Sequence, residues 1–213
     1  LAAGVMAAAI DNGQRVVCVT ASLGEHGTDD PAAWPPPRLG RVRSWEASAA
    51  MAVLGVDEHR LLGLPDGALD EHEDTGIAMV LEILDEVRPD TILTFGPDGM
   101  TYHPDHIAVH RWVTAAWHRR GCTSRLMYAI PTVEHLERFR DLYEEWGMYM
   151  TDDRPVGVPE SELDLYVRLD GPMLDRKLTA LRALATQTSG VMSIVDPGVY
   201  AQQVCEEAFI DAA

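Results

Sequence analysis

The segment 96–110 concentrates side chains that could bind a metal ion and move protons. His103, His106 and His110 recur at spacings of three and four residues, and Asp105 lies between the first two. A neutral histidine nitrogen is a common ligand of Zn²⁺, and a carboxylate can bind the metal or orient a histidine. One histidine at such a place is more often a cap or a surface residue. Three histidines with an aspartate, however, predict part of a metal site.

The elements expected around this segment place it where chemistry is often found. An apolar run at 91–95 predicts a buried strand that leads directly into the segment. Pro104 suits the first position of a helix, so we expect a helix over 104–120 with His103 near its cap. A helix start supplies free N–H groups and positive potential, and both stabilise developing negative charge.

The histidine spacing does not indicate a zinc protease of the zincin type. His106 and His110 have the required spacing of four, but Ile107 follows the first histidine where that motif needs a glutamate. The histidines therefore indicate a different kind of site.

Predicted strands and helices alternate along the chain, which is typical of an α/β fold built on a parallel sheet. Ligands of such sheets bind beyond the carboxyl ends of the strands. The loops after Ser22, Leu64 and Phe95 leave such ends, so we expect them to share one edge of the sheet, with the strand that ends at Phe95 in a central position. Strands are predicted at 15–22, 59–64, 91–95, 125–130 and 163–169, and helices at 1–12, 41–55, 77–88, 104–120, 133–146, 171–187 and 197–210.

Composition limits the classes of function. The 213 residues are enough for one substantial domain. The formal net charge of −17 argues against a nucleic-acid or anionic-membrane partner, because both need clustered Lys and Arg. No apolar stretch is long enough for a transmembrane helix, and no secretory signal is seen. Three cysteines without a CxxC pair favour a reducing cytoplasm, and the abundance of Ala, Gly, Pro and Arg suggests a bacterial source.

Four short motifs follow one another along the chain: Leu23-Gly24-Glu25-His26-Gly27, Leu64-Pro65-Asp66-Gly67, Gly96-Pro97-Asp98-Gly99 and His103-Pro104-Asp105-His106. In this order and spacing they resemble the LmbE-like / PIG-L superfamily of zinc-dependent N-deacetylases. The resemblance covers nearly the whole chain and implies a Rossmann-like three-layer α/β domain with a mainly parallel sheet.

The resemblance also implies roles for individual residues. His106 corresponds to a zinc ligand. His103 corresponds to the neighbouring imidazole that assists the tetrahedral intermediate or protonates the leaving amine, and Asp105 to a group that holds one of these rings in its tautomer. Three further residues resemble substrate-side positions: Glu25, Arg43 and Asp66.

Plainer interpretations of two of these residues are still open. A helix-face ion pair between Arg43 and Glu46 is as well supported as a substrate contact. Asp66 can equally be a turn residue that precedes Gly67.

The chain departs from the family pattern in three places. The family's first motif, HPDDE, supplies two zinc ligands and the general base, and no such string occurs here. Since 1–12 resembles the helix that follows this motif, we expect a single domain over 1–213 that lacks its first strand and first metal motif. Tyr102 precedes His103 where relatives often have glycine, and Leu184 replaces a histidine near the retained pair Thr186-Gln187.

The function implied by the resemblance is zinc-dependent removal of an N-acyl group, with N-acetyl favoured, from an amino sugar or sugar conjugate. Such an enzyme acts on a small molecule and needs neither nucleic acid nor membrane, while self-association into a homo-oligomer is left open. The alternative is a non-catalytic or metal-free homologue that serves as a small-molecule binding module. A Rossmann nucleotide-binding protein is disfavoured because no GxGxxG follows any predicted strand.

Overall fold

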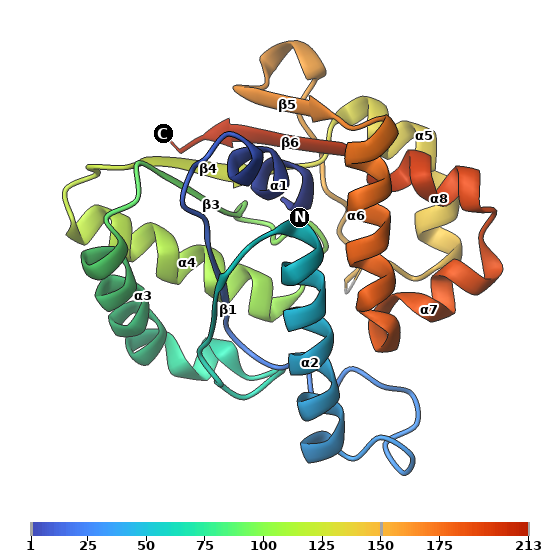
Figure 1. Ribbon diagram of the computed structural model, residues 1–213, viewed down its shortest axis with the longest axis horizontal. Coiled ribbons are helices and arrows are strands. Elements are labelled where there is room, and N and C mark those ends of the chain that lie inside the picture. Colours follow the sequence, from blue (N-terminus) through green and yellow to red (C-terminus); the bar gives the residue numbers. More distant parts are fainter. Residues whose placement is uncertain (1, 150, 213) are drawn as a thin grey trace. The chain divides into compact units, whose positions relative to one another are not determined.

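The computed structural model in Figure 1 describes residues 2–149 and 151–212. The chain divides into two compact units. Unit 1 comprises Leu1–Gly67 and Val167–Glu206, and unit 2 comprises Ala68–Tyr166 and Glu207–Ala213. The expectation of a single domain over 1–213 stays a prediction.

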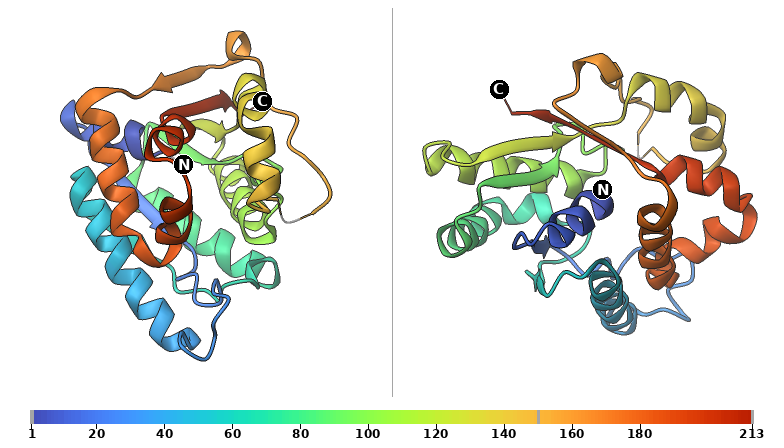
Figure 2. Two further views of the ribbon diagram at one scale, coloured as in Figure 1. Left: turned by 90° about the vertical axis from the view of Figure 1, so that its right-hand side faces the viewer. Right: turned by 45° about the horizontal axis from the view of Figure 1, so that its top comes forward.

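Unit 1 combines a two-stranded parallel sheet with helices. β1 and β2 pair in register, from Val17 opposite Glu58 to Thr20 opposite Leu61. Helices α2 and α6 lie side by side (Figures 1 and 2), with small residues such as Ala50 and Ala180 in the core of the unit. The elements of unit 1 are α1 (Ala3–Asp11), β1 (Val17–Thr20), α2 (Pro36–Leu54), β2 (Glu58–Leu61), α6 (Gly171–Ala183), α7 (Ala185–Ile194) and α8 (Pro197–Val204).

Unit 2 contains most of a four-stranded sheet of order β3-β4-β6-β5. β3 and β4 are parallel, while β4 and β6 are antiparallel. Strands β5 and β6 lie at the points where the chain passes from one unit to the other. The elements are η1 (Leu69–His72), α3 (Glu73–Val87), β3 (Thr91–Phe95), α4 (Pro104–Arg119), β4 (Arg125–Ala129), α5 (Val133–Glu145), η2 (Glu160–Glu162), β5 (Leu165–Arg168) and β6 (Glu206–Asp211).

A glycine allows the two long helices of unit 2 to pack closely. Trp112 of α4 is 1% exposed and lies against Gly76 of α3. A Cβ atom on Gly76 would overlap the indole ring of Trp112. This contact fixes α4, and α4 carries the histidines identified in the sequence.

Most predicted elements are confirmed within a few residues, and four predictions need correction. β3 lies at one end of the strand order and is not central among the described strands. The helix expected over 197–210 ends at Val204 and is followed by β6, because Phe209 pairs with β4 and is fully buried there. The helix expected over 171–187 breaks at Leu184 into α6 and α7, and the helix expected from 41 begins at Pro36.

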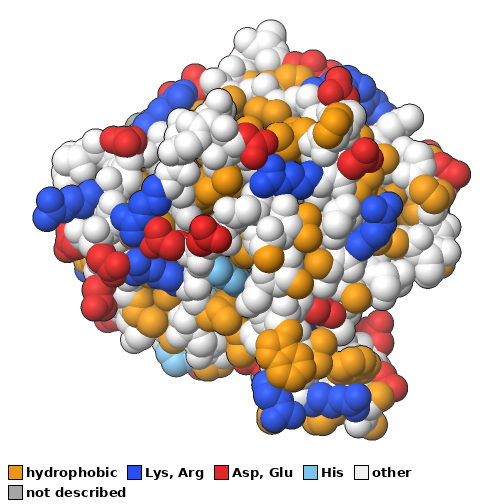
Figure 3. Space-filling view, in the orientation of Figure 1, with side chains coloured by type: hydrophobic (Ala, Val, Ile, Leu, Met, Phe, Trp, Pro, Cys, Tyr) orange, Lys and Arg blue, Asp and Glu red, His pale blue; other side chains and the backbone are white. Residues whose placement is uncertain are grey.

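The surface of the molecule shows both signs of charge. On the face in Figure 3, acidic and basic side chains are interspersed, and hydrophobic side chains gather near the first half of α2. Trp45 of α2 is 68% exposed. In the described part of the chain, every helix is too short or too polar to span a membrane.

Candidate active site

The loop between β3 and α4 brings the predicted histidines of unit 2 together. Gly96–Gly99 turns the chain, and the backbone N–H of Gly99 donates to the carbonyl oxygen of Gly96 at 3.0 Å. Gly99 has a φ of +62°, and a Cβ atom there would lie 2.8 Å from Cβ of His106. Glycine is therefore required by both the backbone conformation and the approach of His106.

His106 is held as a neutral ring with one free nitrogen. Its Nδ1 lies 3.0 Å from the carbonyl oxygen of Gly99, and because a carbonyl only accepts, Nδ1 is the donor. Nε2 of the neutral ring then keeps its lone pair. The ring stacks on Phe95 with centroids 4.2 Å apart, and burial lowers the pKa of His106. These are the properties of a metal ligand oriented by a backbone carbonyl.

His103 is held in the opposite tautomer. It caps α4, and its Nδ1 accepts the backbone N–H of Asp105 at 3.1 Å. In the neutral ring the proton is therefore on Nε2, which makes this nitrogen a donor and not a ligand. The rings of His103 and His106 stack with centroids 4.8 Å apart. Of the two neighbouring imidazoles, His106 can therefore act as a metal ligand and His103 as a hydrogen-bond donor.

Asp105 anchors this loop from the first turn of α4. The residue is 5% exposed, and its Oδ1 accepts the backbone N–H of Leu69 at 3.1 Å. The resemblance implies that the carboxylate of Asp105 sets the tautomer of a neighbouring histidine. In the structure, the backbone N–H of Asp105 sets the tautomer of His103. The negative charge of Asp105 favours the protonated form of His106, although burial of that ring outweighs it and lowers the pKa.

The donor chemistry of this segment fits His106 as a metal ligand, because its Nδ1 donates to Gly99 and its Nε2 is free. His110 is held in the same way, with its Nδ1 on the carbonyl oxygen of Phe95 at 2.9 Å, so the family resemblance is what distinguishes His106. Across 2–149 and 151–212, no three His, Cys, Asp or Glu side chains converge as a ligand set. The described residues therefore fit His106 as a ligand but do not by themselves make up a complete metal site.

In unit 1, Asp66 joins the loops that follow β1 and β2. Its Oδ1 accepts from the hydroxyl of Ser22 at 3.1 Å, and its Oδ2 accepts from the backbone N–H of His26 at 2.9 Å. The expectation that the loops after Ser22 and Leu64 share one edge is confirmed by these contacts. Asp66 is thus more than a turn residue before Gly67, because it holds the loop of residues 23–27.

Glu25 completes this cluster. Its Oε1 accepts the backbone N–H of Asp66 at 3.0 Å. Its Oε2 is buried and has no hydrogen-bond partner among the described residues. A buried carboxylate oxygen without a partner is costly, so it is a site at which a polar ligand group would be stabilised.

Arg43 fastens the same loop to α7. Two of its nitrogens donate to the carbonyl oxygens of Gly24 and Gly27, and its Nε donates to the hydroxyl of Thr186 at 3.3 Å. Burial lowers the pKa of Arg43, an effect opposed by the nearby carboxylates, with Asp66 the largest contributor among them. Three of its five N–H groups are therefore used to hold the protein itself.

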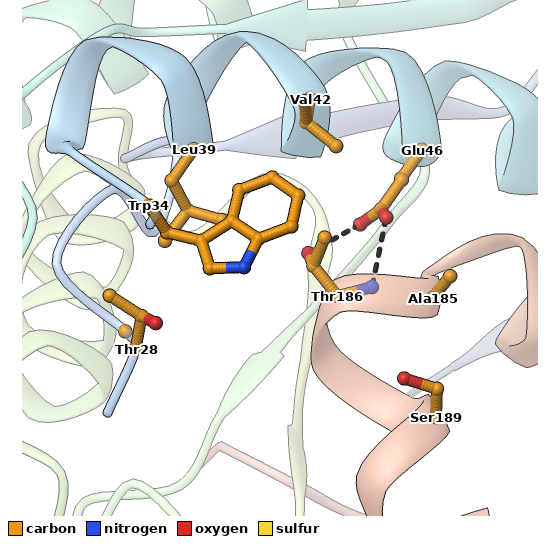
Figure 4. Close-up of a pocket in the computed structure, with 9 residues that line it drawn as sticks. Thr28, Trp34, Leu39, Val42, Glu46, Ala185, Thr186 and Ser189 are labelled. Carbon is orange, nitrogen blue, oxygen red and sulfur yellow. Dashed lines mark hydrogen bonds between the residues drawn. The ribbon is translucent and has the colours of Figure 1, made fainter. Parts of the chain in front are cut away.

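Thr186 joins Arg43 to Glu46. Oε1 of Glu46 accepts the backbone N–H of Thr186 at 2.8 Å, and Oε2 accepts its hydroxyl at 2.7 Å (Figure 4). In the described residues, Arg43 and Glu46 meet through Thr186 and form no direct ion pair. In the sequence, Thr186 was identified only as part of the family resemblance. No sequence pattern predicted the hydrogen bond between its hydroxyl and Arg43.

The predicted site residues thus fall into two groups. Unit 1 brings together the three substrate-side residues Glu25, Arg43 and Asp66, through the loop of residues 23–27. Unit 2 brings together His103, Asp105 and His106 at the start of α4. Ser22, which donates to Asp66, and Thr186, which accepts from Arg43, are additional neighbours whose contacts no motif predicted.

Comparison with known proteins identifies the family of this chain. A family model described as "PIG-L: GlcNAc-PI de-N-acetylase" matches residues 1–117. A relative from Saccharomonospora viridis, named 1D-myo-inositol 2-acetamido-2-deoxy-alpha-D-glucopyranoside deacetylase, is 32% identical over 220 residues, which cover 86% of this chain and 78% of the relative.

Solved structures show the same fold. The structure of the A40926 pseudoaglycone deacetylase Dbv21 is similar with a TM-score of 0.71 at 20% identity, and the match covers 100% of this chain and 92% of that one. The N,N'-diacetylchitobiose deacetylase from Pyrococcus horikoshii is similar with a TM-score of 0.67 at 17% identity, covering 99% and 77%. The expected Rossmann-like α/β class is thereby confirmed. From the extent of the family match and of the relative at 32% identity, the chain belongs to the PIG-L family of GlcNAc-PI de-N-acetylases.

Proposed function

We propose that the protein is a zinc-dependent hydrolase that removes the N-acetyl group from an amino-sugar conjugate. Membership in the PIG-L family supports the reaction, and the relative's name supports an N-acetylglucosaminyl substrate. The proposed cofactor is Zn²⁺, with His106 as one ligand. When bound, zinc would supply an acidified water and polarise the amide carbonyl.

The observation that carries this proposal is the pair of opposite tautomers on His103 and His106. The free Nε2 of His106 is a ligand atom, whereas the Nε2–H of His103 is a donor. We assign to His103 Nε2–H the hydrogen bond that stabilises the developing oxyanion. Asp105 holds the loop that carries both rings.

The residues of unit 1 are proposed to bind the sugar. The unpartnered Oε2 of Glu25 is suited to accept a hydrogen bond from a sugar hydroxyl. Asp66 and Arg43 position the Glu25 loop through its backbone, and Arg43 keeps two N–H groups for the substrate.

The remaining zinc ligands are proposed to come from an HPDDE motif, as the resemblance implies. That motif does not occur in the 213 residues. We therefore expect the chain of residues 1–213 to hold no complete zinc site, and a form in which a strand and an HPDDE segment precede Leu1 to bind one equivalent of zinc. Zinc-dependent hydrolysis by the 213-residue chain would show that the ligands have been wrongly assigned.

The decisive assay measures acetate release from N-acetylglucosamine conjugates, together with zinc content. In the form that carries the HPDDE segment, His106→Ala should weaken zinc binding by at least about tenfold. His103→Asn should retain zinc and lose turnover. The matched control is His118→Ala, an exposed position at the far end of α4 that should change neither quantity. Turnover without zinc, or full turnover by His103→Asn, would contradict the proposal.

The alternative binding-module function has a distinct outcome in the same experiment. A protein that binds the sugar conjugate but releases no acetate with zinc present would be a non-catalytic homologue. A bacterial source and a cytoplasmic location are proposed on two grounds. The relatives come from bacteria, and Cys18, Cys122 and Cys205 form no disulfide.

A further inference from the structure

Tyr102, the residue before His103, has a backbone conformation that is unfavourable for a residue with a side chain. Its φ is +58°, in the left-handed region, and Met100 of the same turn has a φ of +66°. The N–H of Tyr102 donates to the carbonyl oxygen of Asp98 at 2.9 Å and closes the turn. His103, which caps α4, therefore follows strained backbone, and such strain persists only where surrounding contacts hold it.

A contact from a distant segment of unit 2 holds Tyr102. Its hydroxyl lies 3.4 Å from the carbonyl oxygen of Arg154, and because a carbonyl only accepts, the hydroxyl is the donor. The two residues are 52 positions apart in the chain, and both belong to unit 2. The bond is long, so even a small displacement of this carbonyl would break it. The conformation of Tyr102 is therefore tied to the position of the backbone at Arg154.

The side chain of Arg154 fixes that backbone. Its guanidinium forms a bidentate ion pair with Glu144 of α5, with Nε 2.6 Å from Oε1 and Nη2 2.9 Å from Oε2. Nη1 donates to the carbonyl oxygens of Thr151 and Asp153, each at 2.9 Å. The guanidinium also lies over the ring of Tyr149 at 4.7 Å. A bidentate charged pair has a specific geometry, so these contacts hold the backbone of Arg154 in one place.

The residues that follow Arg154 are attached to the other end of α5. Val158 pairs with residues 131–133 at the start of this helix, through two backbone hydrogen bonds of 3.1 Å. Glu144 lies in the last turn of the same helix. The backbone from Arg154 to Val158 is thus anchored to α5 at two points. Helix α5 therefore presents the carbonyl oxygen of Arg154 to Tyr102.

We propose that Arg154 is a positioning residue for His103. Through its ion pair with Glu144, Arg154 keeps its own carbonyl oxygen beside the hydroxyl of Tyr102. Tyr102 then stays left-handed, and the chain enters α4 in the direction that places Nδ1 of His103 3.1 Å from the backbone N–H of Asp105. In that position His103 presents its Nε2–H as a donor. The inference rests on the function proposed above and adds to it a residue outside the motifs.

Amide hydrogen exchange tests this role without zinc or catalysis. The N–H of Asp105 exchanges when its bond to His103 opens, so its exchange rate in the 213-residue chain reports the position of His103. Glu144→Ala removes the partner of Arg154 and should speed this exchange about threefold, the effect expected of an exposed ion pair. The backbone N–H of Trp112, in the middle of α4, should keep its rate. An unchanged rate at Asp105, or equal acceleration at both amides, would overturn the proposal.

Glu145→Ala is the matched control. Glu145 is the next residue of α5, is exposed, and forms no ion pair with the described residues. The substitution removes the same side chain and the same charge, and it should leave the exchange rate of Asp105 unchanged. If both variants accelerated this exchange equally, the charge of α5 would be responsible instead of Arg154, and the proposal would be wrong.

A glycine in place of Tyr102 separates positioning from general support. Glycine adopts a left-handed φ without strain and needs no contact to hold it there. In the Tyr102→Gly background, Glu144→Ala should therefore no longer change the exchange rate of Asp105. If Arg154 acted on α4 by another route, the two changes would be additive. An acceleration of the same size in the glycine background would refute the path through Tyr102.

Kinetics distinguish this inference from the proposed function. In the form that carries the HPDDE segment, Glu144→Ala should lower kcat about threefold and leave KM nearly constant, because His103 bonds to the oxyanion of the transition state. A rise in KM alone would contradict the positioning of His103. If the unsubstituted protein releases no acetate, or if His103→Asn keeps full turnover, the proposed function fails. The exchange rate of Asp105 still decides whether Arg154 positions His103.

Discussion

Nδ1 of His106 lies 3.0 Å from the carbonyl oxygen of Gly99, seven residues earlier in the chain. This single bond places the lone pair of the proposed zinc ligand on Nε2. It depends on a glycine, because Gly99 has a left-handed backbone and faces the Cβ of His106. The geometry of the ligand is therefore determined by a residue that has no side chain.

Gly99→Ala should destabilise unit 2 and disturb His106. The left-handed φ costs about 1 kcal/mol for a residue with a Cβ, and the contact 2.8 Å from the Cβ of His106 adds to this. Urea denaturation measures the change in the free energy of unfolding. The matched control is Gly121→Ala, since Gly121 has a φ of +72° and a Cβ added to it would meet no atom within 4 Å. Equal losses of unfolding free energy in the two variants would show that the contact with His106 does not contribute to stability.

Asp105→Ala should cost about 1–3 kcal/mol of stability, because it leaves the backbone N–H of Leu69 without its acceptor. Asp105→Asn keeps an oxygen at the same position and should retain most of the stability. Thermal and urea unfolding of both variants provide the comparison. Equal losses in the two would show that the negative charge, and not the hydrogen bond to Leu69, is what matters.

Gly76→Ala should destabilise α3 and α4 by about 1–3 kcal/mol, since the new methyl group would overlap the ring of the buried Trp112. The double variant Gly76→Ala/Trp112→Phe should lose less than the sum of the single variants. Gly190→Ala, also in a helix but with open space around its Cβ, should be neutral or slightly stabilising. Strict additivity of the two changes would rule out the proposed overlap.

Acidification should destabilise unit 1 through His59. Burial lowers the pKa of His59 below its ordinary value of 6.5, so the folded state binds the proton less readily than the unfolded state. The stability contributed by neutral His59 is present above this ordinary value and is lost as the pH falls through the lower, folded value. Urea unfolding at several pH values should show a smaller loss in acid for His59→Gln than for the wild type.

Thr20→Val provides the control for the cause of this shift. It removes the hydroxyl that lies 2.9 Å from Nε2 of His59 but preserves the bulk that buries the ring. Its acid sensitivity should match that of the wild type, since burial is the dominant cause of the lowered pKa. A flattened profile for Thr20→Val would identify the hydrogen bond as the cause.

Local physics made much of unit 2 predictable from the sequence. Strand β3 and the start of α4 were expected at 91–95 and Pro104, and the structure has them there. Apolar patterning specifies a buried strand, and proline specifies a first helical turn, through interactions within a few residues. The choice of His103 and His106, by contrast, came from the resemblance, and their roles stay proposals.

The tail of the chain shows where local patterns fail. Residues 206–210 were expected to continue a helix, yet they belong to β6, because Phe209 is buried against β4. A short apolar run suits either element, and the partner strand far away in the sequence decides between them. The edge position of β3 likewise depends on which strands pair, and no local pattern encodes that choice.

The amino-acid sequence by itself determined the class of fold, the start of the histidine helix and the family resemblance. Only the tertiary structure decided that Thr186 joins Arg43 and Glu46 across about 140 residues, and that His103 and His106 carry opposite tautomers. The physical reason is the distance along the chain over which the interactions act. Periodicity and helix capping involve residues within one or two turns. A tautomer depends instead on groups far apart in the sequence that packing brings within hydrogen-bond distance.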